Sequence, residues 1–121
     1  MLRAADVYLL VAEAKIRSGA NGDAEINAVR TRNNLPAVSN ATIQQLIHER
    51  RVELAGENER HQDLMRWDRA GIIDLKAHYA IDRGQWKPGR NFQTPKNYLF
   101  PIPQRQIDLS NGILEQNPDF K

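Results

Sequence analysis

The sequence predicts an all-α protein: a tetratricopeptide-like helix hairpin, further helices, and then an irregular Pro/Gly-rich C-terminal segment. Two observations carry this prediction. Apolar residues recur at helical spacing through residues 1–79, and turn-forming residues separate the runs. Prolines and glycines interrupt every such period over the loop-rich residues 80–121. A chain of 121 residues, 40% of them hydrophobic, suffices for a single domain spanning residues 1–121.

The first helix is expected from Leu2 to Ser18, where a glycine-containing turn ends it. Apolar residues cover more than half of its circumference, and Asp6, Glu13 and Arg17 form a narrow polar strip. A helix that is apolar on more than one side packs between neighbours. We therefore expect the chain, taken alone, to expose apolar surface on this helix and either to self-associate or to be only marginally stable. The apolar residues are Ala4, Val7, Tyr8, Leu10, Val11, Ala12, Ala14 and Ile16.

A second helix is expected from Asp23 to Asn33, with Asp23 as its N-terminal cap and Pro36 just beyond its end. The two helices form a hairpin whose small residues fall at the spacing of a tetratricopeptide repeat. Because such repeats bury their core by stacking, a single hairpin needs neighbours. The alternative function is a self-contained tetratricopeptide-like protein-interaction module, in which the hairpin offers a groove to a peptide or partner helix. The small residues are Ala12, Gly19, Ala24, Ala28 and Pro36.

Two more helices follow. The third begins near Thr42, which forms a capping-box pattern with Gln45, and continues to about Ala55 before Gly56. The fourth spans residues 60–70.

The irregular segment holds one further short helix in this interpretation, with Pro103 in its first turn and Leu109 at its end. Four apolar residues of the segment are expected to anchor it on the helical part of the chain: Leu99, Phe100, Ile102 and Ile107.

Charged residues occupy the apolar stripe of the third helix. Arg50 lies in the middle of the stripe that Ile43, Leu46, Ile47 and Leu54 define. Glu53 lies at its edge. Lone buried charges are costly, whereas arginine and carboxylate pair through two hydrogen bonds. The pattern predicts a buried or half-buried structural ion-pair network, made of Arg50, Glu53, Glu57, Arg60, Asp63 and Arg66.

The catalytic alternative assigns Glu49, Glu53, Glu57 or Asp63 to an acid and base pair, as glycoside hydrolysis requires. Arginines interleave with these carboxylates and favour the ionised state of all of them, whereas a catalytic pair needs two separated environments. The sequence therefore predicts no catalytic residues and no enzyme.

This charged stretch closely resembles the signature of the SusD/RagB family, the surface glycan-binding lipoproteins of Bacteroidetes-type bacteria. The blocks that carry the resemblance appear in the family's C-terminal order: Ala5-Asp6-Val7-Tyr8, Ile26-Asn27-Ala28-Val29-Arg30-Thr31-Arg32, Glu49 to Glu57, Asp63-Leu64-Met65-Arg66-Trp67, Pro101-Ile102-Pro103 and Gln116-Asn117-Pro118. The chain departs from the family pattern at Gly56, Asn58 and Glu59, where an aromatic residue, a glycine and a histidine are usual.

The resemblance implies a non-catalytic C-terminal portion of an outer-membrane nutrient-binding protein. Such a protein captures oligosaccharides at the cell surface and works with a TonB-dependent transporter. The family's N-terminal helical repeats, signal peptide and lipid-bearing cysteine are not found in the chain as given, which contains no cysteine. No apolar run reaches the roughly 20 residues that span a bilayer.

Candidate ligand-binding residues lie in the irregular segment. Trp86, Arg90 and Phe92 combine aromatic faces with a hydrogen-bond donor, a mixture suited to stacking on a sugar. Aromatic residues in loops also serve to anchor the loop, and the resemblance implies that most glycan contacts come from other parts of the family's proteins.

Other functional classes lack support in the sequence. A net charge of +2 does not indicate the strongly basic surface that is typical of nucleic-acid-binding proteins. His48, His61 and His78 lack metal-ligand spacing, so no metal site is predicted. No glycine-rich phosphate loop or nucleophile motif is present, so no cofactor is predicted.

Overall fold

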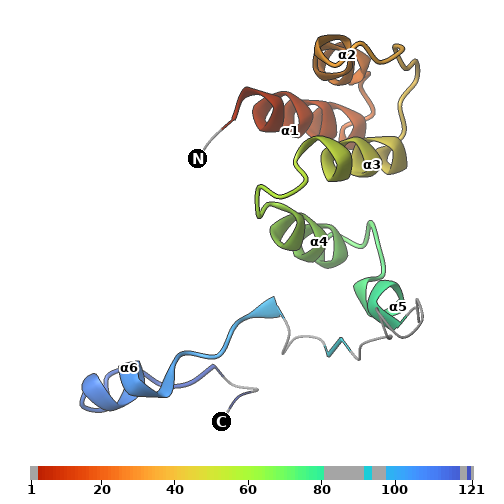
Figure 1. Ribbon diagram of the computed structural model, residues 1–121. Coiled ribbons are helices and arrows are strands. Elements are labelled where there is room, and N and C mark those ends of the chain that lie inside the picture. Colours follow the sequence, from red (N-terminus) through yellow and green to blue (C-terminus); the bar gives the residue numbers. More distant parts are fainter. Residues whose placement is uncertain (1–2, 81–91, 94–97, 118–119, 121) are drawn as a thin grey trace. The chain divides into compact units, whose positions relative to one another are not determined.

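The computed structural model describes residues 3–80, 92–93, 98–117 and 120. All the regular elements within these residues are helices, which confirms the predicted all-α class (Figure 1). The chain forms two compact units, Met1–His61 and Gln62–Lys121. No helix in the described part is long and apolar enough to cross a membrane.

The first unit is built around the hairpin of α1 (Ala4–Arg17) and α2 (Asp23–Arg32), and α1 also packs against α3 (Ile43–Glu53). Its core takes small and branched apolar residues from all three helices: Ala5, Leu9, Ala12, Ile26, Val29 and Leu46. The hairpin is confirmed, with boundaries within two residues of those expected.

Gly22, the N-cap of α2, lies close against α1. A Cβ atom added there would lie 2.8 Å from the carbonyl oxygen of Ala12, which leaves room for glycine alone. Ala24 and Ala28, two of the small residues at tetratricopeptide spacing, are exposed. Ala12, another of these small residues, is buried in the core, and the turn residue Gly22 lies against it.

Asp23 does not cap α2, and the prediction that it does was wrong. Gly22 is the N-cap, and the Asp23 carboxylate instead accepts backbone hydrogen bonds from Asn40 at 2.7 Å and Ala41 at 2.8 Å. The Asn21 side chain accepts the Asp23 amide at 2.8 Å. Because the loop amides reach the Asp23 carboxylate, this residue ties the segment before α3 to the start of α2.

The capping box of α3 is confirmed. Thr42 accepts the backbone amide of Gln45 at 3.3 Å, and the Gln45 side chain accepts the Thr42 amide at 2.8 Å. The helix ends at Glu53, two residues before the predicted end, and Gly56 follows in a left-handed conformation with φ +83. Glu57 therefore lies beyond the helix.

The second unit contains α4 (Arg60–Arg69) from its third residue on, then α5 (Leu75–Ala80) and α6 (Gln104–Leu109). Pro103 is the N-cap of α6 with φ −55, one residue before its expected place in the first turn. The core of the unit combines Leu64, Met65, Leu75 and Phe92, with Ile73, Tyr79 and Tyr98 packed against it.

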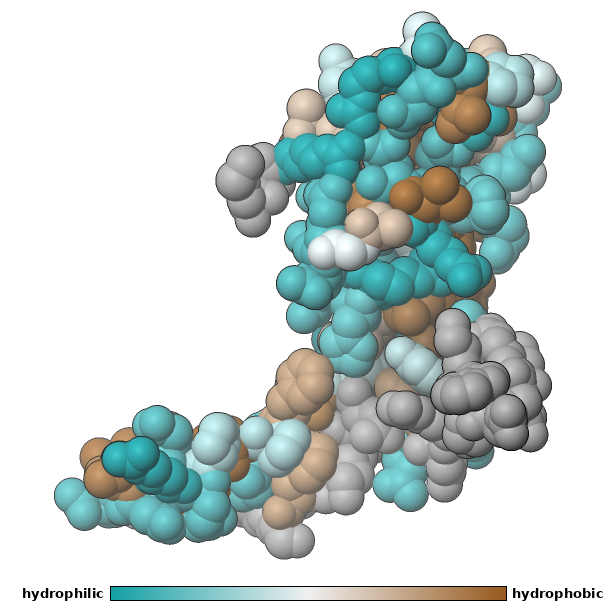
Figure 2. Space-filling model, viewed as in Figure 1, coloured by the Kyte–Doolittle hydropathy of each residue, from teal (hydrophilic) through white to brown (hydrophobic). Residues whose placement is uncertain are grey.

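The segment around α6 is held by side-chain amides. Gln116 donates to the Ile102 carbonyl at 2.9 Å and accepts its amide at 2.8 Å, as a strand partner would. Leu99 and Phe100, expected as anchors, are exposed, so that prediction was wrong for both. Tyr98 packs inward instead. Apolar atoms also show at the surface of the α6 segment, where Leu109 and Ile113 are exposed (Figure 2).

Candidate functional site

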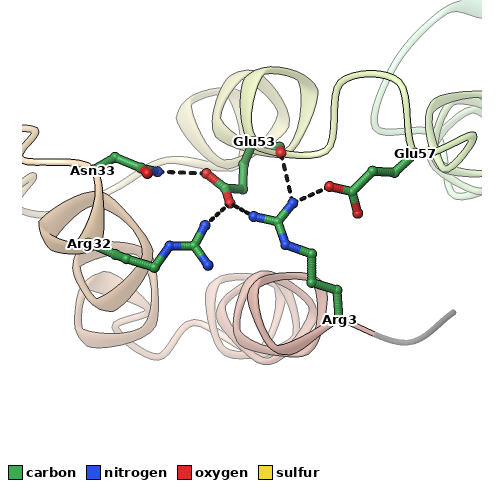
Figure 3. A network of polar contacts seen from close by, with 5 residues as sticks. All are labelled: Arg3, Arg32, Asn33, Glu53 and Glu57. Atoms are coloured by element: carbon green, nitrogen blue, oxygen red, sulfur yellow. Dashed lines mark hydrogen bonds and ion pairs between the residues drawn. The ribbon is translucent and has the colours of Figure 1, made fainter.

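The charged constellation of the first unit converges on Glu53, at the last turn of α3 (Figure 3). One Glu53 oxygen accepts hydrogen bonds from Arg3 and Arg32, and the other accepts the Asn33 side chain at 2.8 Å. Arg3 also donates to the Glu53 carbonyl at 3.2 Å and to Glu57. The Glu53 side chain is 7% exposed. The cluster joins the start of α1, the end of α2 and the end of α3.

A second pair lies inside the unit. Arg50 is 2% exposed, in the middle of the apolar stripe of α3, and its guanidinium donates to the Asp6 carboxylate at 2.8 Å. It also reaches the Asp6 carbonyl at 3.4 Å. Breaking a buried pair by removing one partner typically costs about 3–5 kcal/mol, because the other charge stays buried. This pair therefore fixes how α1 lies on α3.

Asp6 and Glu13 of the polar strip of α1 consequently face the interior, whereas Arg17 is exposed. Asp6, Leu9 and Glu13 are buried on one face, and Glu13 pairs with Arg17 at 3.5 Å. Val7, Tyr8 and other apolar residues of α1 are exposed. Helical periodicity alone did not reveal this orientation, because the partner of Asp6 is Arg50, on a different helix.

Glu49 completes the interhelical pairs. Its carboxylate is buried and accepts from Arg30 of α2 at 2.5 Å, while the Arg30 Nε atom donates to the Pro36 carbonyl at 2.8 Å. Glu49 was not among the residues predicted for the ion-pair network. The arginine-rich block at residues 26–32 was the signal that could have identified Arg30 and Arg32 as its partners.

Asp63 and Arg66 pair along α4 at 2.9 Å, where the three-residue spacing places them on one face. Asp63 is buried, and Arg66 lies 4.9 Å from the centre of the Trp67 ring. Arg60 also makes polar interactions. Of the six residues predicted to form one network, Asp63 and Arg66 pair with each other, whereas Arg50, Glu53 and Glu57 pair with residues outside the six. A single network of the six stays a prediction. The partners missed by sequence reasoning are Arg3, Asp6, Arg30 and Arg32.

The carboxylates of Glu49 and Glu53 bind other residues of the chain, which is a structural role. Both oxygens of Glu53 accept hydrogen bonds from the chain itself, and the Glu49 carboxylate is held by Arg30. A general acid or base needs an oxygen that reaches a substrate. In the described residues, no group of three or more histidine, cysteine or acidic residues is arranged to hold a metal ion.

Two acidic residues at the start of α2 titrate below their ordinary range. The backbone amide of Ala41 and the Asn21 side chain lower the pKa of Asp23. The hydrogen bond from Lys15, at 2.5 Å, lowers the pKa of Glu25. In both cases the donors stabilise the ionised carboxylate.

Of the three candidate ligand residues, Phe92 is described, whereas Trp86 and Arg90 lie outside the described residues. Phe92 is 7% exposed, stacks on Tyr79 at 5.4 Å between ring centres, and meets the Tyr98 ring edge-on at 5.8 Å. The ring therefore helps to anchor the second unit. A glycan contact by these three residues stays a prediction.

Tyr98 is the third ring of this aromatic cluster, beside Tyr79 and Phe92. Its hydroxyl donates to Asp68, and this hydrogen bond, together with desolvation, raises the pKa of Tyr98. The Arg69 guanidinium lies 4.6 Å from the centre of the Tyr98 ring, within range of a cation–π contact.

Comparison with known proteins decides the family. A sequence profile of the SusD family matches residues 1–120. The chain belongs to the SusD family. Its relatives include SusD-like protein P25 of Formosa agariphila, 32% identical over 127 residues, and the starch-binding protein SusD of Bacteroides thetaiotaomicron, 34% identical over 125 residues.

Solved SusD-like structures share the fold. Surface glycan-binding protein A from Bacteroides uniformis gives a TM-score of 0.75 at 29% identity over 93% of this chain. A laminarin binding SusD-like protein gives 0.69 at 36% identity over 98% of the chain. Surface glycan-binding protein A from Bacteroides thetaiotaomicron, in complex with laminarihexaose, gives 0.72 at 28% identity over 93%.

The SusD match covers this chain almost completely but only part of each relative. The chain spans 23% of the Formosa protein, 21% of the starch-binding protein and 22–26% of these three solved chains. The similarity therefore concerns a region of about a quarter of a SusD-like protein or less.

Proposed function

We propose that this chain is the non-catalytic helical support of an outer-membrane glycan-binding protein that serves oligosaccharide uptake. The observation that carries the proposal is the match to the SusD family over residues 1–120, with relatives whose names state starch, laminarin or glycan binding. In this proposal the domain of residues 1–121 contributes a scaffold, and a TonB-dependent transporter is the membrane partner.

The arrangement of charges supports a scaffold. Glu53, Arg50 and Glu49 each bind a residue of another helix, so the three helices of the first unit are fixed in one arrangement. Networks in which every member is satisfied rigidify a fold. A rigid scaffold suits a protein whose ligand contacts come from other segments, and a lipid anchor on the longer protein places it at the outer membrane.

A chimeric protein tests the proposal. In the starch-binding protein SusD of Bacteroides thetaiotaomicron, the segment matched by this chain is replaced with residues 1–121, and starch binding is measured by affinity electrophoresis. We expect a folded chimera that retains starch binding. A chimera that folds by circular dichroism but loses starch binding would contradict a purely supporting role.

The matched control carries Glu53→Ala within the grafted segment, which removes the acceptor shared by Arg3, Arg32 and Asn33. We expect this control to unfold at a lower temperature than the parent chimera. Equal stability of the two chimeras would show that the network does not support the fold.

The second candidate function is a protein-interaction module with the tetratricopeptide-like hairpin. One observation favours it: Ala4, Val7, Tyr8 and Val11 of α1, together with Glu25 of α2, line a hollow of about 460 Å³. Saturable binding of a helical peptide by monomeric residues 1–121, lost on Val11→Glu, would support this function.

A further inference from the structure

Asn-Gly is a chemically labile dipeptide, and the chain contains it twice, at Asn21-Gly22 and Asn111-Gly112. The backbone nitrogen after an asparagine can attack the side-chain carbon Cγ, and glycine leaves this nitrogen unhindered because it has no Cβ atom. Asparagine is for this reason one of the thermolabile residues of proteins. The attack requires a side-chain amide that rotates toward the nitrogen and a backbone that bends to meet it.

The first pair lies in the turn of the hairpin, where its groups are held. The Asn21 Nδ2 atom donates to the Asp23 carboxylate at 2.9 Å, and the Asn21 Oδ1 atom accepts the Asp23 amide at 2.8 Å. Gly22 is buried against α1, where an added Cβ atom would lie 2.8 Å from the Ala12 carbonyl oxygen. Attack on Asn21 therefore requires two hydrogen bonds to break and a packed backbone to move.

The second pair follows α6 and is exposed to solvent. Asn111 and Gly112 have φ angles of 51° and 84°, in the left-handed region, and both residues are exposed. Among the described residues, no hydrogen bond involves the Asn111 side chain or the Gly112 amide. A Cβ atom added at Gly112 would meet no atom within 4 Å. Both reacting groups are therefore accessible to water and unrestrained.

The turn around the second pair is fixed by its neighbour. The Ser110 hydroxyl donates to the Ile107 carbonyl at 2.7 Å and accepts the Leu114 amide at 2.9 Å. These contacts hold the residues on both sides of the turn and leave Asn111 and Gly112 at its tip. The two Asn-Gly pairs thus share a local sequence and differ in how the fold restrains them.

We propose that Asn111 is a deamidation site of this protein and that the fold protects Asn21 from the same reaction. The Gly112 nitrogen loses its proton to hydroxide and bonds to Cγ of Asn111, while Nδ2 takes a proton from water and leaves as ammonia. Water then opens the succinimide at either carbonyl, which gives aspartate or isoaspartate. The reaction needs no oxidant or cofactor and does not depend on glycan binding.

Peptide mass spectrometry of the folded chain, incubated at mildly alkaline pH, tests the proposal. Tryptic cleavage, carried out at mildly acidic pH to stop the reaction, places the two pairs on separate peptides, residues 18–30 and 106–121. We expect Asn111 to deamidate at least about tenfold faster than Asn21, because Asn21 must first lose two hydrogen bonds. Isoaspartate should accompany aspartate at residue 111, since both arise from one succinimide.

The unfolded chain is the matched control. In guanidinium chloride the two asparagines keep their following glycines and lose the contacts of the fold, so their rates should become similar. A tenfold difference that persists in the denaturant would assign the protection of Asn21 to its local sequence and overturn the role of the fold.

Two variants separate the halves of the proposal. Asp23→Ala removes the carboxylate that binds Asn21 Nδ2, so Asn21 should deamidate about fivefold faster, with the rate at Asn111 unchanged. Asn111→Gln should leave the peptide of residues 106–121 unmodified, because glutamine would close a less favourable six-membered ring. The other asparagine of this peptide, Asn117, precedes a proline, whose nitrogen has no proton to lose. Circular dichroism verifies that both variants are folded.

Three results would overturn the proposal. The first is an equal or faster reaction at Asn21 in the folded chain. The second is an Asn111 that stays intact in the folded chain while it deamidates in the unfolded one. The third is a product at residue 111 that is aspartate alone, since direct hydrolysis of the side-chain amide gives no isoaspartate.

Discussion

The contacts inside each of the two compact units differ in their chemistry. In Met1–His61, arginine and carboxylate side chains connect neighbouring helices, as in the Arg50–Asp6, Arg30–Glu49 and Arg32–Glu53 pairs. In Gln62–Lys121, an arginine–carboxylate pair lies within α4, between Asp63 and Arg66, whereas the described contacts between segments centre on aromatic rings and side-chain amides, notably Phe92 with its tyrosine neighbours and Gln116 with Ile102.

The difference has a physical consequence. Ion pairs and charge-assisted hydrogen bonds demand a defined geometry, and losing one partner leaves a charge behind. Aromatic contacts depend mainly on buried area and tolerate adjustment. In the first unit, the loss of stability on substitution should therefore depend on which partner of an ion pair is changed. In the second unit, it should increase with the buried area that the substitution removes.

The largest expected effect comes from the buried pair of the first unit. Arg50→Met should destabilise the protein by about 3–5 kcal/mol, because the Asp6 carboxylate is left without its guanidinium partner. The double variant Arg50→Met with Asp6→Leu should regain much of this loss. Urea unfolding of the single and double variants measures both values, and an equally unstable double variant would show that the pair itself is stabilising.

Truncation in the aromatic cluster should follow buried area. Phe92→Ala should cost about 3 kcal/mol, since the ring packs against Tyr79 and Tyr98. Phe100→Ala is the matched control, because Phe100 is 71% exposed and the expected change is within about 0.5 kcal/mol. Thermal unfolding compares the two, and similar losses would mean that exposure does not rank aromatic residues in this unit.

A smaller effect is expected at the capping box of α3. Thr42→Ala should cost about 1 kcal/mol because the Gln45 amide loses its acceptor at the helix start. Thr31→Ala, at an exposed position inside α2, should leave stability nearly unchanged. Chemical unfolding of both variants tests whether local capping matters beside the interhelical ion pairs. If Thr42→Ala leaves the stability unchanged, α3 is stabilised by its tertiary contacts and not by its cap.

The smallest expected effect is the acid dependence contributed by Asp23. The Ala41 amide and the Asn21 side chain lower the pKa of Asp23 in the folded state. A lowered folded pKa contributes stability above the unfolded value of about 4 and loses it as pH falls through the folded value. Asp23→Asn should therefore flatten the decline of stability below about pH 4. An unchanged slope in pH-dependent unfolding would assign the acid sensitivity to other carboxylates.

Much of the fold followed from the sequence because its signals are local. Thr42 and Gln45 specify a capping box within four residues, and Gly56 follows the end of α3 in the left-handed region that glycine adopts freely. The period of apolar residues likewise predicted α1, α2 and α4. The end of α3 was set two residues too late because apolar spacing continues through Leu54, which is buried just past the last helical turn.

The site was less predictable, since its contacts join residues far apart in the chain. The burial of Arg50 followed from its position among apolar neighbours, but its partner Asp6 lies 44 residues away. Arg3 is separated from Glu53 by 50 residues. No periodicity connects such pairs, so sequence reasoning identified the charges without their partners.

The sequence by itself determined the all-α class, the helix hairpin, the SusD-family signature and the presence of a charged residue in the apolar stripe of α3. Only the tertiary structure decided that α1 turns Asp6 and Glu13 inward and which of its apolar residues, among them Val7, Tyr8 and Val11, lie at the surface. The physical reason is that a helix carrying apolar residues on several sides has no preferred orientation of its own. A buried arginine on another helix selects the face that carries Asp6, and the remaining apolar face is left at the surface.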